Sequence, residues 1–340
     1  MRRSTQNCYH CPTLRGENPT LADSTAGATA SRIVKPRANL LGPRELPALA
    51  FLTILVVGML IFARNFGSST NLFVIGQDMA ITGIMAVGMT MVILTGGIDL
   101  SVASVLTLAA TVTGMLMMRG IGIPLAVLAG LAMGIGCGFL NGALITWLRI
   151  PPIITTLGMM GILRASASLY TGGAYIGPLP MDFGFVGVKW TPIILLVVVA
   201  AGGAIFLSRV RLGRHIHAVG GNEEAVRLSG VRLNRVKQVV YTLNGLLAAV
   251  SGMILASSMS SAQSNMAKGY ELNVIAAVVI GGTSITGGTG SVPGTIIGAA
   301  IMSLLYNAVN LLGISKFWHQ LIIGVVILAA VLIDRLRSER

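Results

Sequence analysis

Few residues in this sequence have the type and spacing that metal binding would require. Cys8 and Cys11 are separated by two residues, as zinc ligands often are, but His10 is the one further ligand type near them. A structural zinc site needs four ligands. We therefore interpret the two cysteines as reduced thiols in a polar tail and predict no metal site. Cys137 lies in an apolar, glycine-rich segment, where a small packing residue is expected.

The motifs of common catalytic and nucleotide-binding sites are absent from the sequence. It contains no G-x-x-x-x-G-K-[ST] phosphate loop, no H-E-x-x-H pair and no G-x-S-x-G motif. Its apolar segments also lack the series of Asp, Glu and His residues that proton-driven carriers use. We predict no catalytic residue and no cofactor bound by this chain, so we do not expect an enzyme.

Some polar side chains nevertheless lie within apolar segments, namely Asn141, Arg164, Asn244, Asn307 and Asn310. If these segments cross a bilayer, such groups are costly and should face the interior of a helix bundle. The amides would then serve either as interhelical hydrogen-bonding groups or as substrate contacts. Arg164 must reach water, a carboxylate or a carbonyl, either in a vestibule near the outer surface or by snorkelling to the membrane interface.

The composition indicates a membrane protein. Of 340 residues, 54% are hydrophobic and only 10% are charged, against about 25% charged in soluble domains, and the mean hydropathy is +0.82. Forty-three glycines suit close helix packing in lipid. The apolar runs are continuous and lack the alternation of a lipid-facing barrel. We therefore predict an all-α polytopic membrane protein.

Ten apolar segments predict about ten transmembrane helices, some of them broken. The predicted spans are Ala48–Ala63, Phe73–Leu94, Ser101–Met118, Gly122–Ile145, Pro152–Thr171, Thr191–Leu207, Gln238–Met259, Leu272–Gly288, Val292–Leu312 and His319–Ile333. Residues 46–335 would form the transmembrane domain, with a disordered cytoplasmic tail at 1–45 and a short cytoplasmic tail at 336–340. The first tail has no apolar segment of the signal-peptide kind, so cleavage is not expected.

The basic residues predict the orientation of these spans. With both termini in the cytoplasm, the cytoplasmic segments hold eighteen Lys and Arg residues and the outer segments hold five. This bias follows the positive-inside rule. The same layout, with charge in tails and one long loop and no aromatic interleaving, explains the net charge of +13 without nucleic acid.

Two glycine-rich interruptions, at residues 95–101 and 281–294, break otherwise apolar segments. Asp99, Ser101 and Ser291 are good helix caps there. Non-helical backbone at membrane depth persists only when buried in protein or lining a water-filled cavity, and matching breaks in two halves point to a transport path. The alternative is that both are ordinary cytoplasmic turns. The predicted translocation path comprises Gly96, Gly97, Asp99, Ser101, Asn141, Arg164, Asn244, Gly281, Gly282 and Asn307.

The long basic loop at residues 208–237 contains a short predicted helix with marked ends. Asn222 is a good N-cap, Glu223 and Glu224 suit the first turn, and Gly230 supplies a stop. A helix of about two turns is marginal by itself in water and needs a surface to pack on. One reading places it on lipid headgroups, helped by Leu212, Ile216 and Val219. The other places it in a cleft of a soluble partner, which Ala225, Val226 and Leu228 would contact.

Several motifs in order resemble the ribose-type monosaccharide permeases of bacterial ABC importers. They are GGNEEAVRLSGV and VKQVVYTLNGLLAAVSGMI in and after the basic loop, LTGGIDLSVAS at residues 94–104, GYELNVIAAVVIGGTSITGGTGSVPGTIIGA at residues 269–299, and NLLGIS at residues 310–315. The resemblance covers residues 48–335. The 45-residue tail is longer than the family's usual start.

The resemblance implies a non-catalytic permease subunit that imports a monosaccharide, a ribose-like pentose or a hexose, across the bacterial inner membrane. Its partners would be an ATPase subunit that binds the ATP, a periplasmic sugar-binding protein, surrounding lipid, and a second permease, identical or related. The implied ATPase contact comprises Gly221, Asn222, Glu223, Glu224, Ala225, Leu228, Ser229 and Gly230. A self-sufficient secondary sugar transporter is the main alternative, and a channel or structural membrane protein is a third class.

Overall fold

The computed structural model describes residues 45–188 and 190–315, together with Trp318, Leu321, Ile322, Gly324, Val325, Leu328 and Leu332. The predicted tails lie outside the described residues, apart from Glu45, and so does most of the predicted span His319–Ile333.

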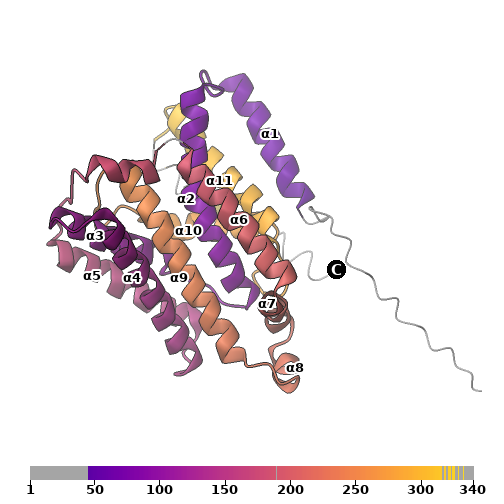
Figure 1. Ribbon diagram of the computed structural model, residues 1–340. Helices are drawn as coiled ribbons and strands as arrows, with labels where there is room; N and C mark the ends of the chain where they lie inside the picture. The colour runs from indigo at the N-terminus through magenta and orange to yellow at the C-terminus, as the bar shows by residue number, and fades with distance from the viewer. Residues whose placement is uncertain are drawn as a thin grey trace, which may run out of the picture. The chain divides into compact units, whose positions relative to one another are not determined.

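The described residues form helices and no strand, as predicted (Figure 1). The helices are α1 (Leu46–Phe62), α2 (Ser69–Leu94), α3 (Val102–Met118), α4 (Ile123–Thr146), α5 (Pro152–Thr171), α6 (Thr191–Arg209), α7 (Arg211–Gly221), α8 (Glu223–Leu228), α9 (Leu233–Ser258), α10 (Tyr270–Ile280) and α11 (Val292–Leu311), with a 3₁₀ helix at Met181–Val186. The one backbone bridge in this part of the chain pairs Ile176 with Ala262.

Six of these helices, α2, α4, α5, α6, α9 and α11, are long and apolar enough to cross a membrane. The polytopic all-helical class is therefore confirmed. The apolar helices α1, α3 and α10 are shorter, so the count of about ten transmembrane helices and the side of each terminus stay predictions.

The predicted span Leu272–Gly288 is wrong in its second half, because α10 ends at Ile280. Its 11 residues rise about 16 Å, roughly half of a hydrocarbon core of about 30 Å. Gly281 and Gly282 follow directly, and Gly282 has a φ of +91°, a left-handed conformation that stops the helix. The glycine-rich interruption thus begins inside the predicted span.

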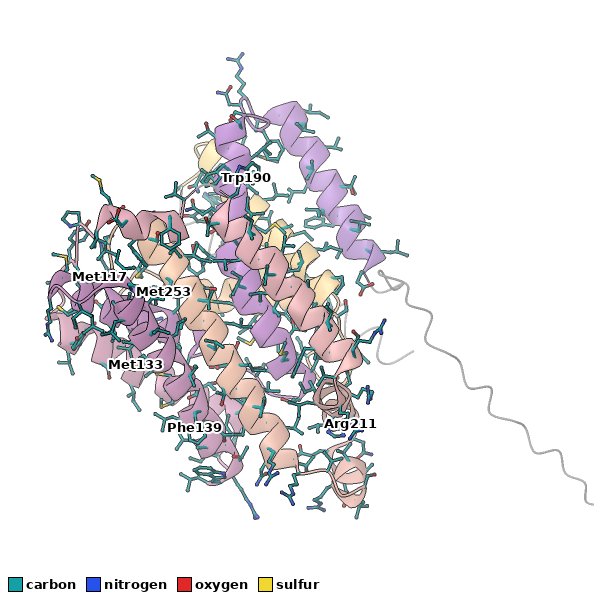
Figure 2. All side chains as sticks on the ribbon, viewed as in Figure 1. Met117, Met133, Phe139, Trp190, Arg211 and Met253 are labelled. Carbon is teal, nitrogen blue, oxygen red and sulfur yellow. The ribbon has the colours of Figure 1, made fainter. Side chains whose placement is uncertain are left out.

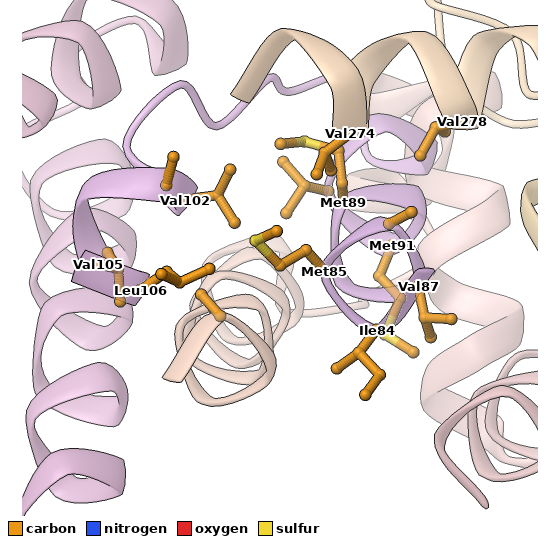
Figure 3. Packing of buried hydrophobic residues seen from close by; sticks show 14 of the residues in the cluster. Ile84, Met85, Val87, Met89, Met91, Val102, Val105, Leu106, Val274 and Val278 are labelled. Atoms are coloured by element: carbon orange, nitrogen blue, oxygen red, sulfur yellow. The ribbon is translucent and has the colours of Figure 1, made fainter. Parts of the chain in front are cut away.

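Helices α2 and α9 lie at the centre of the fold. In the most apolar stretch of α9, 67% of the residues are buried, against 22% in the most apolar stretch of α6. Helix α6 therefore leaves most of its surface for lipid or a partner. Methionines of α2 fill the interior, where Met85 and Met89 lie near Val102 and Leu106 of α3 and Val274 of α10 (Figure 3). Helix α1 packs on α11 at the periphery.

A ridge of glycines brings α4 against α9. The ridge consists of Gly130, Gly134, Gly138 and Gly142, one glycine every four residues; the last three face α9, and Gly130 lies between α9 and α3. A Cβ built on Gly138 would lie 2.3 Å from the carbonyl oxygen of Tyr241. The two backbones therefore approach as closely as small-residue packing in membranes allows.

Candidate functional site

The loop between α6 and α9 contains one more helix than predicted. Helix α7 places Ile216 and Val219 in the protein interior, where they are 0% and 2% exposed. The interpretation of these residues as contacts to lipid headgroups is therefore wrong. Their spacing of three residues is helical, but the polar composition around them masked that signal. Exposed arginines lie within α7 and on either side of the two short helices: Arg209, Arg211, Arg214, Arg232 and Arg235. Figure 2 shows Arg211 at this end and Trp190 toward the opposite end of α6.

Helix α8 has the predicted bounds and caps. The side chain of Asn222 accepts a hydrogen bond from the backbone N–H of Ala225 at 2.9 Å. Glu223 and Glu224 occupy the first turn, where they complement the positive end of the helix. Gly230 has a φ of +80° and its N–H donates to the carbonyl of Arg227 at 3.1 Å, which ends the helix.

Helix α8 presents its tip outward from the rest of the described chain. None of its residues is buried, and Leu228 is 80% exposed. Val226 is half-buried and packs against the main core. Both carboxylate oxygens of Glu223 accept hydrogen bonds at 2.9 Å from the ammonium group of Lys237 at the start of α9. The helix is thus held at its base by Lys237, and Leu228 remains exposed at its tip.

The last turn of α7 lies against the end of α2, at Leu94, and against the second glycine-rich interruption, at Gly288. The N–H of Gly288 donates to the carbonyl of Leu94 at 3.0 Å, and Nδ1 of His217 lies 3.1 Å from the carbonyl oxygen of Gly288. A Cβ on Gly220 would lie 1.8 Å from the Leu94 oxygen and 2.3 Å from the Gly288 nitrogen. We call these contacts of Leu94, Gly220 and Gly288 the glycine junction.

A cavity of about 330 Å³ lies beside the glycine junction. It is bounded by the predicted path residues Gly96 and Gly97, by the cap of α8 at Asn222 and Glu223, and by Tyr241 of α9. This volume holds several water molecules. The base of α8 therefore faces a polar space on the side toward α9.

A buried polar network links the first interruption to two helices. Asp99, 1% exposed, accepts through Oδ1 from the N–H and hydroxyl of Ser101 at 2.8 and 2.6 Å, and through Oδ2 from the amide of Asn244 at 2.8 Å. The amide of Asn141 donates to the Ser101 hydroxyl at 2.7 Å. Ser101 is the N-cap residue of α3, but its side chain makes no capping bond, contrary to expectation. In this conformation the amides of Asn141 and Asn244 connect α4 and α9 to the segment that precedes α3.

Arg164 and Asn307 lie away from the glycine junction. Arg164 of α5 forms an ion pair with Glu271 of α10 at 3.5 Å, so its partner is a carboxylate. Asn307, near the end of α11, exchanges two amide hydrogen bonds with Asn71, at 2.7 and 3.2 Å. The predicted path residues therefore do not gather in one site, and their part in translocation stays a prediction.

A polar group in the interior of α2, the carboxylate of Asp78, was not identified from the sequence. Asp78 lies in the interior of α2, and the Tyr270 hydroxyl donates to its Oδ1 at 3.2 Å. A carboxylate within an apolar run was the available signal. Its partner lies 192 residues away in the sequence.

Comparison with known proteins gives consistent matches over most of the chain. The model of the family described as "Branched-chain amino acid transport system / permease component" matches residues 71–331. The ribose import permease protein RbsC of Escherichia coli K12 is 42% identical over 299 residues, 85% of this chain and 93% of that protein. RbsC of Bacillus subtilis 168 is 41% identical over 295 residues, covering 84% and 91%.

A further relative carries a different name. The autoinducer 2 import system permease protein LsrC of Yersinia enterocolitica is 36% identical over 304 residues, 86% of this chain and 83% of that protein. Among solved structures, an inward-facing metal-chelate type ABC transporter has a TM-score of 0.47 at 15% identity, over 79% of this chain and 90% of that one. That weak likeness adds nothing to the matches in sequence.

Proposed function

The chain belongs to the branched-chain amino acid transport system / permease component family, as a ribose-type ABC importer permease, and from this premise we propose that it imports a monosaccharide of the ribose-like pentose or hexose class. It is a multi-pass transport protein of the bacterial inner membrane. The observation that carries the proposal is α8, a capped and exposed helix in the long basic loop. A self-sufficient secondary transporter is not favoured, because the family is a permease component of a larger system.

The proposed ATPase contact is the exposed surface of α8 and its caps, Gly221–Gly230. The partner subunit would bind and hydrolyse ATP, and this chain would supply neither step. A periplasmic sugar-binding protein would select the sugar and deliver it to the opposite side of the membrane. A second permease, identical or related, and the surrounding lipid would cover the apolar faces of the outer helices.

The glycine junction supports a way to couple docking to access. Movement of α8 by its partner would carry α7, to which it is directly joined. Because Gly220 touches the Leu94 carbonyl and the Gly288 nitrogen without intervening side chains, α7 would displace the end of α2 and the second glycine-rich interruption together. In this proposal Gly96, Gly97, Gly281 and Gly282 shape the path, while Asp99, Ser101, Asn141 and Asn244 hold the surrounding helices in register.

We extend the proposal to a topology of ten spans with both termini in the cytoplasm. Arg227 and Lys268 lie beyond opposite ends of α9, so they should face opposite compartments. A compartment-sensitive reporter fused after Arg227 should report the cytoplasm, and one fused after Lys268 should report the periplasm. The reverse pattern would reject the ten-span topology.

Docking is tested by replacing the tip of α8 in the full chain. The triple variant Glu223→Ala, Glu224→Ala, Leu228→Ala should release the ATPase from membranes and abolish ATP-dependent uptake of D-ribose. Because no residue of α8 is buried, the spans should remain folded, which thermal unfolding of the purified permease checks.

The matched control is Met181→Ala, which removes a side chain that is 97% exposed and lies outside the basic loop. It should leave ATPase binding and uptake unchanged. If the ATPase still co-purifies with the triple variant at the wild-type level and uptake persists, the docking assignment is wrong.

A further inference from the structure

A second cavity, of about 170 Å³, lies among α2, α9, α10 and α11. It is formed near the first residues of α10 and the last turns of α9 and α11. The glycine junction involves the opposite ends of α2 and α11, at Leu94 and near Ser291. The cavity is therefore separate from the docking end, and in the proposed topology it lies in the outer half of the membrane.

Polar groups line this cavity from four helices, and α9 contributes Ser258. Asp78 comes from α2, Tyr270 from α10, and Ser303 and Asn307 from α11. The Tyr270 hydroxyl donates to Oδ1 of Asp78 at 3.2 Å, which leaves further lone pairs on the carboxylate for other donors. The amide of Asn307 is held by its two bonds to Asn71. Asp78, Tyr270 and Asn307 are thus fixed in position by contacts within the protein.

The remaining wall is apolar, with Ile81 and Leu255 among the lining residues. An apolar wall with a few convergent polar groups is typical of a small-molecule site. The volume of about 170 Å³ is below the roughly 300–1,000 Å³ of sites for drug-sized ligands. It fits a ligand of one small ring.

The chemistry of the lining narrows the ligand class. No lining residue is Lys, Arg or His, so nothing there pairs with a phosphate or carboxylate ligand. One carboxylate among hydroxyls and amides is also a poor match for a divalent cation, which takes several hard oxygen ligands. A neutral ring with several hydroxyls fits, because each hydroxyl can donate to Asp78 or to the phenol oxygen of Tyr270, or accept from an amide.

We propose that this cavity binds a neutral, polyhydroxylated ligand of monosaccharide size, with Asp78 and Tyr270 as its principal polar contacts. The inference rests on the proposed function and deepens it, by giving the permease its own sugar site on the side opposite the ATPase. A substrate leaving the binding protein would meet this site before it reached the glycine-rich interruptions.

The test measures equilibrium binding of radiolabelled D-ribose, D-xylose and D-galactose to the full chain in lipid nanodiscs, without a binding protein. We expect saturable binding of at least one sugar by the wild type. Asp78→Asn should weaken that binding about tenfold or more, because it removes a charged acceptor. Tyr270→Phe removes one hydroxyl and should weaken binding about threefold to tenfold.

The matched control is Asp182→Asn, which neutralises an exposed carboxylate in the 3₁₀ helix outside the cavity, and it should bind as the wild type does. If Asp78→Asn fails to fold, as thermal unfolding would show, Tyr270→Phe decides the question. The proposal is overturned if the wild type binds none of the three sugars, or if the folded variants bind them unchanged. Competition by Na⁺ alone at constant ionic strength would indicate a cation site and would also overturn it.

Failure here is distinguishable from failure of the importer assignment. The α8 variants probe ATPase docking and contain no residue that lines this cavity. ATPase release by those variants, combined with no sugar binding in the nanodiscs, would leave the permease role intact and reject the cavity as a sugar site.

Discussion

At the α8 end of the molecule, α7 meets the end of α2 and the second glycine-rich interruption through main-chain atoms, at Gly220, Leu94 and Gly288. At the opposite end, helices meet through long side chains, in the Arg164–Glu271 ion pair and the Asn71–Asn307 amide pair. Main-chain contact has no rotamers to absorb a displacement, whereas side-chain contacts can part and form again. The first arrangement suits transmission of movement from a docked partner. The second suits helices that separate when access changes.

The largest effect is expected at the glycine junction. Gly220→Ala would place a methyl group 1.8 Å from the Leu94 carbonyl oxygen, and backbone atoms cannot rotate away as a flexible side chain would. Overpacking of this kind costs about 1–3 kcal/mol and occasionally more, and contact with rigid backbone atoms places this variant at the upper end. We expect loss of transport and a clear fall in the unfolding temperature in nanodiscs.

The neighbouring glycine provides the control for this prediction. An added Cβ at Gly221 meets no atom of the described chain within 4 Å, so Gly221→Ala should keep its thermal stability. Equal destabilisation by the two variants would show that the close main-chain approach at Gly220 is not the cause.

An intermediate effect is expected at the opposite end. Arg164→Met leaves Glu271, whose side chain is 12% exposed, without its ion-pair partner. Because Arg164 itself is 30% exposed, we expect a loss of only about 1 kcal/mol in the free energy of unfolding. The double variant Arg164→Met, Glu271→Gln should recover part of that loss in a double-mutant cycle. A loss as large as that of Gly220→Ala would contradict the comparison.

The smallest effect is expected where a side-chain contact occurs at the docking end. Glu223→Gln weakens the bond to Lys237, but Glu223 is 52% exposed, so the stability change should be about 0.5 kcal/mol. Chemical or thermal unfolding should barely register it. A change above about 2 kcal/mol would show that α8 is held more rigidly than its exposure indicates.

The sequence predicted those elements whose signals are local. Pro152 begins α5 and Gly172 follows its last residue, and the predicted span agrees with both ends. Asn222 and Gly230 likewise gave the ends of α8. The predicted C-terminal end of α10 was wrong. Residues 281–288 are mostly glycine, threonine and serine, yet the paired glycines that end the helix were counted within the predicted span.

Contacts between distant segments were not predictable from local pattern. Arg164 was expected to need a partner, but nothing near it in sequence indicates Glu271. The bond between Asn244 and Asp99 joins residues 145 positions apart. Such pairs depend on which faces of two helices meet, and a single sequence contains the polar residues without their partners.

The exposed arginines around the docking helix, from Arg209 to Arg235, have a consequence for the bilayer itself. In the proposed topology they lie close to the cytoplasmic leaflet, whose anionic lipids attract basic side chains by about 1 kcal/mol per residue near the surface. The docking face would therefore gather acidic lipids around α8. The surface potential of the membrane, and not only the abundance of the partner, would then set how readily the two subunits meet.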